Sequence, residues 1–337
     1  MIVYFSTVRR KRPIREGGEI VKLDWTAKRV LKALPVFPSD PDIAEDPNPR
    51  GNSRGGKGIL VRGGEVFVGT YHTLLAFDSD LNLKRRVGNN LFVNIHEIGA
   101  DGDDLWVSST TIDCALKVDM SGRTLKSWWP REEPLLRARF GLTPLVLNKQ
   151  ADNRLLHLHA ELGGQESHTH LNAVCCGGGR TYVLLNRQGA LVQIEPEVRV
   201  VLEDERLRNS HSPVLMDDGR RVAICCSFRK DILFYDLESG ALQRRLHLPD
   251  FPEVAALQKL HPDEPFNSAI FVRGLELVGP DRLLVGVSPA TILEVDAAAH
   301  RLLDVFQYSR DVGDAVHGLA VFQGPDPENP PAKNESV

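Results

Sequence analysis

Six short segments of the chain each begin with a side chain that could bind a metal ion or an anion. Each segment continues as a short, largely apolar run, and the first residues are Lys57, His96, His170, His211, Arg273 and His317. Histidine thus occupies four of the six first positions, although the chain contains only 11 histidines among 337 residues. We therefore interpret the four as one set, whereas a single histidine would be expected to be a polar residue at a strand end.

Converging imidazoles would favour a transition metal. Cations such as Lys57 and Arg273 disfavour a nearby imidazolium, so the pKa values of the four histidines should fall and the rings should be neutral near pH 7. Uncharged nitrogen ligands suit Fe, Cu, Zn, Ni or Co, and not the oxygen-seeking Ca or Mg. We expect a divalent transition metal, with Fe, Zn and Cu the main candidates, bound by three or four of His96, His170, His211 and His317. The alternative is a metal-free pocket in which His, Lys and Arg side chains bind an anion through charge-assisted hydrogen bonds.

Other polar residues near these positions are candidates for substrate binding and proton transfer. Lys57 and Arg273 would bind a carboxylate, phosphate or sulfate group of a small substrate. Further candidates for substrate binding are Asn172, Tyr71 and Arg229. Glu97 and Glu276 are candidate catalytic carboxylates that could carry protons or orient histidines. The alternation of side chains along a strand turns both away from the axis, which makes them the weaker candidates.

An internal repeat predicts the elements that position these residues. A short alternating or β-branched run, a turn and a second run with an acidic end recur five times, and the acidic residues are Asp78, Asp119, Glu195, Asp236 and Asp296. Another apolar run precedes each unit and a weaker one follows it. Four strands per repeat are typical of a β-propeller blade. The pattern predicts five complete blades at about residues 57–90, 94–129, 169–202, 209–248 and 270–308.

The two ends of the chain complement each other. Residues 1–36 supply three strands and residues 314–322 supply one, which predicts a sixth blade that closes the ring. Closure removes the free sheet edges that promote aggregation. The predicted fold is therefore an all-β, six-bladed β-propeller in a single domain, residues 1–322. Two sandwiches would also contain short strands at this spacing, but would not explain the complementary termini.

Three connections between the predicted blades are long, and in a propeller all three lie on the face where the inner strands begin. They comprise residues 37–56, 130–168 and 249–269, and we expect them to form a lid over the histidines. Residues 135–147 could form a short helix or an apolar flap. His157, His159 and His168 are accessory ligands or solvated residues, and residues 46–57 form an anion-binding loop or a linker. The Pro-rich residues 323–337 should be disordered.

Composition and charge narrow the classes of function. The chain has 41 Lys and Arg against 45 Asp and Glu, which argues against a nucleic-acid partner bound by bulk electrostatics. Basic turns at residues 9–12, 187 and 229–230 fall on the histidine face and would steer a small anionic molecule or peptide toward it. No apolar run approaches the ~20 residues of a membrane span. Five cysteines without a CxxC motif suit a reducing compartment. We expect a cytoplasmic protein with no membrane partner.

Four motifs carry a resemblance to known propellers. They read HLN at residues 170–172, HSP at 211–213, RGL at 273–275 and GVS at 286–288. In this order they resemble a group of uncharacterised bacterial six-bladed propeller proteins, which implies the fold and no settled activity. The histidine layout is more distantly similar to carotenoid-cleavage-type oxygenases, seven-bladed propellers that hold iron with four axial histidines, and this similarity is one of architecture. The histidine layout differs from that of strictosidine-synthase-like and lactonase-like propellers, which bind calcium through carboxylate and Asn ligands or lack metal.

These observations support three hypotheses about function. The first is a metal-dependent oxidoreductase, lyase or hydrolase that acts on a small anionic substrate. The second is a non-catalytic propeller that binds an anionic small molecule or peptide in a cationic central channel. The third is a protein-interaction scaffold.

Overall fold

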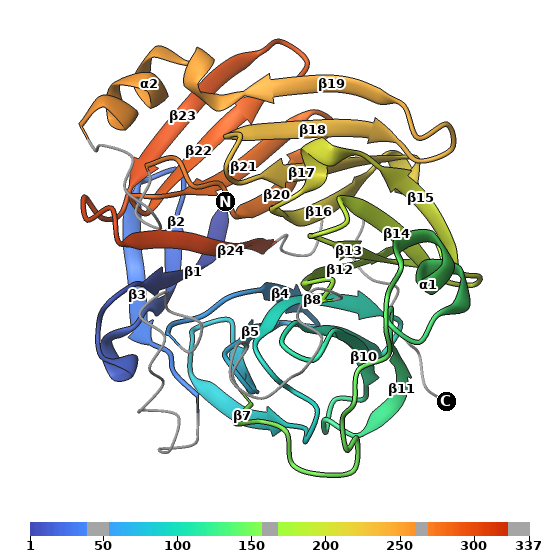
Figure 1. The fold of residues 1–337 in the computed structure, drawn as a ribbon. Helices are drawn as coiled ribbons and strands as arrows, with labels where there is room; N and C mark the ends of the chain where they lie inside the picture. The colour runs from blue at the N-terminus through green and yellow to red at the C-terminus, as the bar shows by residue number, and fades with distance from the viewer. Residues whose placement is uncertain (39–53, 157–167, 261–268, 323–337) are drawn as a thin grey trace, which may run out of the picture.

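The computed structural model describes residues 1–38, 54–156, 168–260 and 269–322. These residues form six four-stranded antiparallel sheets, which are arranged as blades around a central axis (Figure 1). The prediction of an all-β, six-bladed β-propeller is confirmed. Residues 323–337, His157, His159 and most of residues 46–57 lie outside the described residues, so the predictions made for them stay predictions.

The blades are numbered along the chain, and each runs from an inner to an outer strand. Blade 1 contains β4 (Ile59–Arg62), β5 (Glu65–Gly69), β6 (Thr73–Asp78) and β7 (Leu83–Gly88). Blade 2 contains β8 (Ile95–Asp101), β9 (Asp104–Ser109), β10 (Cys114–Val118) and β11 (Thr124–Trp128). Blade 3 contains β12 (Leu171–Gly177), β13 (Arg180–Leu185), β14 (Ala190–Glu195) and β15 (Arg199–Glu203).

The remaining blades follow the same order. Blade 4 contains β16 (Ser210–Met216), β17 (Arg221–Cys226), β18 (Asp231–Asp236) and β19 (Leu242–His247). Blade 5 contains β20 (Gly274–Gly279), β21 (Arg282–Val287), β22 (Thr291–Asp296) and β23 (Arg301–Gln307). Blade 6 contains β24 (Asp314–Phe322), β1 (Ile2–Arg9), β2 (Glu19–Asp24) and β3 (Arg29–Pro35).

The ring is closed by the two ends of the chain, as predicted. Strand β24 from the C-terminal end pairs antiparallel with β1, so that Val3 lies opposite Val321 and Phe5 lies opposite Leu319. On its other edge β1 pairs with β2. The two ends therefore share one sheet, in which β1 is paired along both of its edges.

Packing between blades explains which strands are apolar. Neighbouring sheets cover both faces of the middle strands, and all six residues of β18 are buried, whereas β11 at the outer edge of blade 2 exposes four of its five residues. Side chains of adjacent blades share apolar clusters: Phe67 of blade 1 packs in the same cluster as Val107 of blade 2. Each pair of neighbouring blades shares one such cluster, and the six clusters follow one another around the axis.

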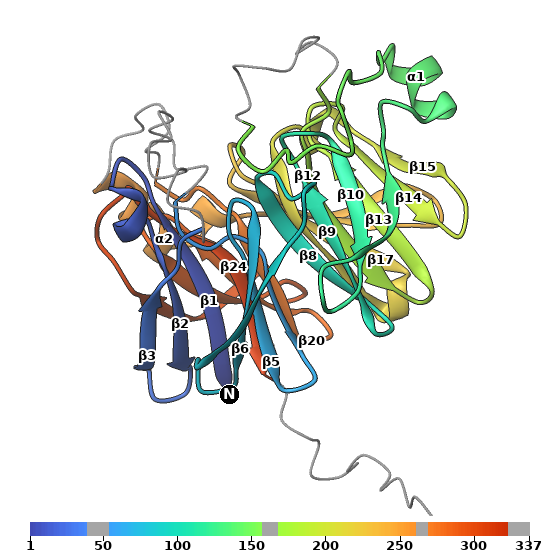
Figure 2. The same cartoon turned by 90° about the horizontal axis from the view of Figure 1, so that it is seen from below.

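Two short helices lie in the long connections between blades. Helix α1 (Pro134–Phe140) overlaps the segment 135–147, where a short helix or flap was expected, and Figure 2 shows it raised above one face of the ring. Helix α2 (Pro252–Lys259) follows blade 4. None of the described helices is long and apolar enough to span a membrane.

Candidate functional site

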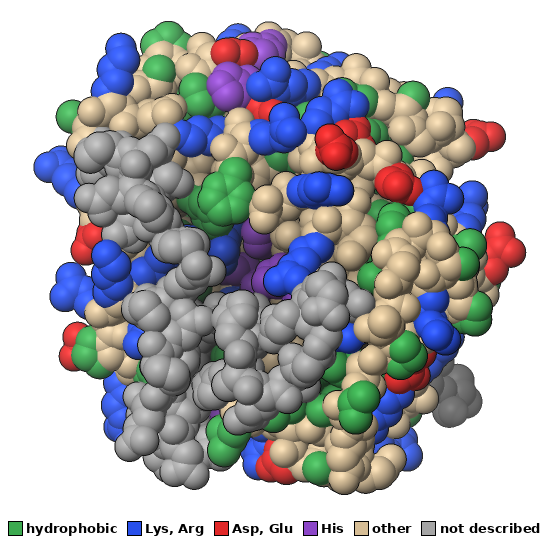
Figure 3. Space-filling view, viewed as in Figure 1, with side chains coloured by type: hydrophobic (Ala, Val, Ile, Leu, Met, Phe, Trp, Pro, Cys, Tyr) green, Lys and Arg blue, Asp and Glu red, His purple; other side chains and the backbone are tan. Residues whose placement is uncertain are grey.

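The four predicted histidines meet at the axis of the propeller. The ring of His96 has its centroid 5.7 Å from the centroids of His170 and His317, and 6.4 Å from that of His211. The rings of His211 and His317 are 6.3 Å apart. Four blades thus bring one imidazole each to a common layer. Figure 3 shows histidine side chains at the bottom of a central hollow with Lys and Arg side chains beside them.

Irregularities in the inner strands place these side chains. The pairing of β8 with β9 shifts between Ile95 and Ile98, so that His96 and Glu97 together oppose a single residue. Similar shifts occur at Asn172 in β12, just after His211 in β16, and at His317 in β24. A β-bulge interrupts the alternation of side chains and redirects them, and such bulges are common beside functional sites. The four bulges lie at the level of the histidine layer.

The hydrogen bonds of the histidines determine which ring nitrogens face the centre. Nδ1 of His96 lies 3.0 Å from the carbonyl oxygen of Asn94, to which it can only donate. Nδ1 of His211 lies 2.8 Å from the Ser227 hydroxyl, whose own proton goes to the carbonyl oxygen of Val272 at 2.6 Å. In both rings Nε2 is therefore left with a free lone pair. This pattern is typical of histidines that bind metals.

His317 and His170 complete the set without such anchors. Both ring nitrogens of His317 are buried and have no hydrogen-bond partner among the described residues. A buried polar atom without a partner is costly in free energy, so it marks a position where a ligand would be stabilising. His170 has a backbone φ of +52°, in the left-handed region that a non-glycine residue rarely adopts. Such strain persists only where the surrounding structure imposes it.

A buried carboxylate holds the segment that carries His170. Asp113, in the turn after β9, accepts hydrogen bonds from the backbone N–H groups of Thr169 and Leu171 and from the Thr169 hydroxyl, at 2.8 to 3.2 Å. This role of Asp113 was not predicted from the sequence, because nothing near Asp113 along the chain indicates a contact with the next blade. His168, which the sequence suggested as an accessory ligand, is buried. Its Nε2 lies 3.0 Å from the carbonyl oxygen of Thr110.

The electrostatic environment keeps the four imidazoles neutral. Burial lowers the pKa of His96, His170, His211 and His317 well below the usual value, and the positive charge of Lys57, of Arg273 or of both lowers each pKa further. Desolvation disfavours the charged ring, and nearby cations act in the same direction. The rings therefore offer lone pairs at neutral pH.

Lys57 and Arg273 border the histidine layer. The Lys57 side chain is buried and its ammonium group donates a hydrogen bond to the side-chain oxygen of Asn94. The guanidinium of Arg273 lies 4.7 Å from the ring centroid of Phe271, and its Nε is buried with no hydrogen-bond partner among the residues that the structure describes. Burial and the neighbouring charge of Arg10 lower the pKa of Arg273 to about 9. An anion at this position would compensate the buried charge.

The two candidate carboxylates line a cavity further along the inner strands. The cavity has a volume of about 300 Å³, and its lining includes Glu97, Glu276, Ser212 and Cys175. Ser212 Oγ lies 2.7 Å from a carboxyl oxygen of Glu97. Burial raises the pKa of Glu97 to about 8 and that of Glu276 to about 7. Both carboxyls therefore titrate near neutral pH, in the range suited to proton transfer.

The position of Glu97 corrects an expectation from the sequence. Regular alternation places Glu97 and Glu276 away from the axis, yet both line the central cavity. For Glu97 the reason is the bulge in β8, which breaks the alternation between His96 and Glu97. A bulge depends on the pairing of two strands, so alternation within one strand does not reveal it.

The remaining candidate substrate-binding residues differ in their surroundings. Asn172 is buried and donates a hydrogen bond of 2.8 Å to the carbonyl oxygen of Ser210, while its own side-chain oxygen has no partner among the described residues. The hydroxyl of the buried Tyr71 donates to the carbonyl oxygen of Leu156. Arg229 is exposed in the turn between β17 and β18. Asn172 and Tyr71 thus tie neighbouring segments together around the layer.

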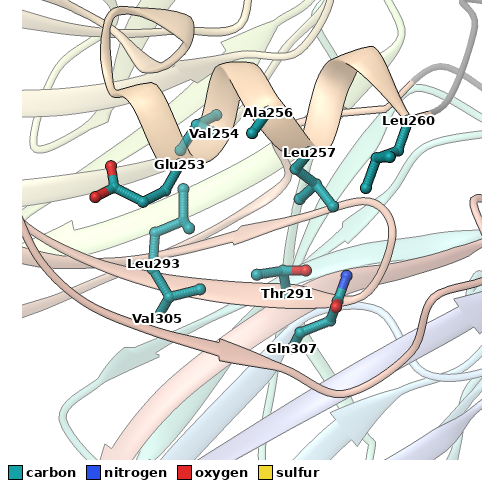
Figure 4. A pocket seen from close by; sticks show the side chains of 9 residues that line it. All are labelled: Glu253, Val254, Ala256, Leu257, Leu260, Thr291, Leu293, Val305 and Gln307. Carbon is teal, nitrogen blue, oxygen red and sulfur yellow. The ribbon is translucent and has the colours of Figure 1, made fainter.

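A second cavity, of about 260 Å³, lies between α2 and the strands β22 and β23 (Figure 4). Its lining is mostly apolar, with Val254, Leu257 and Leu293 among the side chains, and Glu253 is its one ionisable residue among those described. Because this cavity lacks a group of polar side chains that converge, the axial layer is the candidate site for chemistry.

The fit of a metal ion depends on both the donors and their spacing. As the side chains stand, no group of three or more His, Cys, Asp or Glu residues within the described ranges could hold a metal ion. Imidazoles bound to one ion at the usual distance have neighbouring ring centroids about 5 Å apart in a tetrahedral site. The observed centroids at 5.7 to 6.4 Å are thus slightly too far apart. The donor type and free lone pairs suit a transition metal, and binding would require the rings to move inward.

These features define a six-bladed β-propeller with a histidine layer on its axis. No protein-family model matches the chain, and no curated protein matches it. Solved structures show the fold: a protein of unknown function from Bacteroides caccae has a TM-score of 0.59 at 11% identity, and covers 94% of this chain and 97% of its own.

Two further structures are similar to lower degrees. A chain in a nidogen/laminin complex has a TM-score of 0.55 at 10% identity, with 94% of this chain and 97% of that chain covered. Virginiamycin B lyase from Staphylococcus aureus has a TM-score of 0.43 at 11% identity, with 72% of this chain and 69% of that chain covered. At such identities a similarity shows the fold alone.

Proposed function

We propose that this propeller is a metal-dependent enzyme that binds a divalent transition metal, Fe, Zn or Cu, in its axial layer and acts on a small anionic substrate. The ligands would be His96, His170, His211 and His317. One observation carries the proposal: four neutral imidazoles from four blades face one another, and both nitrogens of His317 are buried without a hydrogen-bond partner in the described part of the chain. Uncharged imidazole nitrogens are the donors that these metals prefer.

The chain's own residues supply the other functions of the proposed site. A bound metal would act as a Lewis acid or activate water or dioxygen. Arg273 and Lys57 would bind the anionic group of the substrate, and the hydrogen bonds to Asn94 and Ser227 orient two of the rings. Glu97 and Glu276, with pKa values near neutrality, would accept and release protons. This set is compatible with oxidative, lyase and hydrolytic chemistry.

Metal analysis of protein purified without a polyhistidine tag tests the proposal. We expect close to one transition-metal ion per chain, either as purified or after reconstitution. His96→Gln should reduce the metal content most, because the His96 ring contacts the other three. His300→Gln is the matched control, since His300 is half exposed beside Asp250, in the turn between β22 and β23. A metal content that Fe, Zn, Cu, Ni, Co and Mn all fail to restore would overturn the proposal.

A second candidate function is supported by the spacing of the rings and by the cations. The imidazole layer is wider than a closed metal site, and Lys57 and Arg273 border it, so a metal-free channel that binds an anionic small molecule or peptide is the alternative. Its affinity would weaken with salt and survive a chelator. The metal-dependent site would lose its ligand binding with the chelator. Titration of phosphate with and without EDTA, at two salt concentrations, separates the two.

A cytoplasmic location also remains a proposal. All five cysteines are free thiols, and Cys114, Cys225 and Cys226 are buried. Free thiols are usual in a reducing compartment. Labelling of intact cells with a membrane-impermeant reagent, followed by fractionation, tests this location.

A further inference from the structure

An exposed aromatic side chain lies close to the histidine layer. Phe228, in the turn between β17 and β18, is 56% exposed, although the side chain is large and apolar. The preceding residue is Ser227, whose hydroxyl contacts His211. Phe228 therefore follows directly on the serine that orients the proposed ligand His211.

Phe228 packs against a second aromatic ring, which in turn contacts two cationic side chains. Its ring packs edge to face on Phe271, with the centroids 5.3 Å apart. The guanidinium carbons of Arg273 and Arg10 lie 4.7 and 5.0 Å from the Phe271 centroid, and the His211 ring is 6.4 Å away. We call this group the aromatic wall; it consists of Phe228, Phe271, Arg10 and Arg273.

We propose that the substrate is a carboxylate attached to a flat apolar or aromatic group, with the carboxylate at Arg273 and the apolar group on Phe228. This inference rests on the proposed function, because it names the class of substrate for the same site. When a guanidinium stacks on an aromatic ring, its N–H groups still point outward in the plane of the guanidinium. They therefore remain able to bind a carboxylate. The buried Nε of Arg273, which has no hydrogen-bond partner within the described ranges, is such a donor.

The exposed ring distinguishes this substrate from a simple anion. Phosphate or acetate would use only the cations and leave Phe228 in water. An aromatic acid would also cover the Phe228 ring, and burial of apolar surface strengthens binding. Offset or edge-to-face contact between the two aromatic rings strengthens it further, by about 5-fold. The aromatic wall therefore favours a carboxylate that carries a flat apolar or aromatic group over an inorganic anion or acetate.

Binding of phenylacetate, acetate and inorganic phosphate to the full chain tests this inference. In isothermal titrations of the metal-reconstituted protein we expect phenylacetate to bind at least 10-fold more tightly than acetate or phosphate. Phe228→Ala should remove most of that difference, and Arg273→Lys should weaken the binding of phenylacetate. Leu125→Ala, an exposed apolar position on the outer strand β11, is the matched control and should change neither.

The outcomes separate this inference from the proposed function. Metal content is measured in the same preparations, and Phe228→Ala should leave it unchanged because Phe228 is not a ligand. If the protein binds metal but prefers acetate or phosphate, or if Phe228→Ala leaves the preference for phenylacetate intact, the inference about the substrate is wrong and the metal site stands. If the protein binds no metal yet still prefers phenylacetate through Phe228, the substrate class holds and the metal-dependent function is wrong.

Discussion

Nδ1 of His211 and the hydroxyl of Ser227 lie 2.8 Å apart, across two strands of blade 4. The Ser227 proton is engaged by the carbonyl oxygen of Val272, in the connection to blade 5, at 2.6 Å. The hydroxyl can therefore only accept from His211, which leaves the lone pair on Nε2. A single serine thus links two blades and determines the tautomer of a proposed ligand.

Loss of this hydroxyl should weaken metal binding. In Ser227→Ala the His211 ring loses its hydrogen-bond acceptor, so both its orientation and its tautomer become less defined. Removal of a partner of this kind typically costs about 10- to 100-fold in metal affinity. Competition titrations with a chromophoric chelator measure the change. Ser239→Ala, in a turn beside Asp236, is the control, and an unchanged affinity in Ser227→Ala would contradict the role given to Ser227.

Gly318, which follows His317, should tolerate no side chain. A Cβ at this position would overlap the carbonyl oxygen of Lys57 and lie 3.0 Å from Ser6 Oγ. We expect Gly318→Ala to lower the free energy of unfolding by about 1–3 kcal/mol, because the backbones of β24 and β4 would have to move apart. Gly88→Ala is the matched control, since a Cβ there meets no atom within 4 Å. Urea denaturation measures both, and equal stabilities would show that β24 has space at Gly318.

Glu276 should make the protein less stable as the pH rises. Burial raises the pKa of Glu276 from 4.5 to about 7, so the folded state holds this proton more tightly than the unfolded state. The free energy of unfolding therefore falls as the pH rises from 4.5 to 7 and is constant above that range. The total decrease is at most about 3 kcal/mol. In Glu276→Gln this loss is absent.

The variant should thus be more stable than the wild type at pH 8 and equally stable near pH 4. Thermal unfolding at both pH values measures the difference. Glu16→Gln, an exposed position, controls for the change in net charge. If the two stability profiles run parallel across this range, the raised pKa of Glu276 is contradicted.

The sequence contained enough information for the architecture. The strand pattern recurs with a blade-sized period, and the complementary ends, residues 1–36 and 314–322, predicted the closure that the pairing of β1 with β24 confirms. The reason is physical: both features depend on short-range periodicity, and each strand must bury its faces against its neighbours. The equivalent positions of the six inner strands likewise predicted that the four histidines converge. The ring centroids of the contacting pairs lie 5.7 to 6.4 Å apart.

Only the tertiary structure decided how these residues are arranged. The bulge that turns Glu97 toward the cavity arises from pairing with β9, the carboxylate of Asp113 reaches Thr169 in the next blade, and Phe228 meets Phe271 across blades 4 and 5. Each contact joins residues that are distant in the chain and depends on the angle and register of two strands. The sequence by itself therefore determined which side chains reach the axis, whereas packing between the blades decided their tautomers, their charges and the wall beside them.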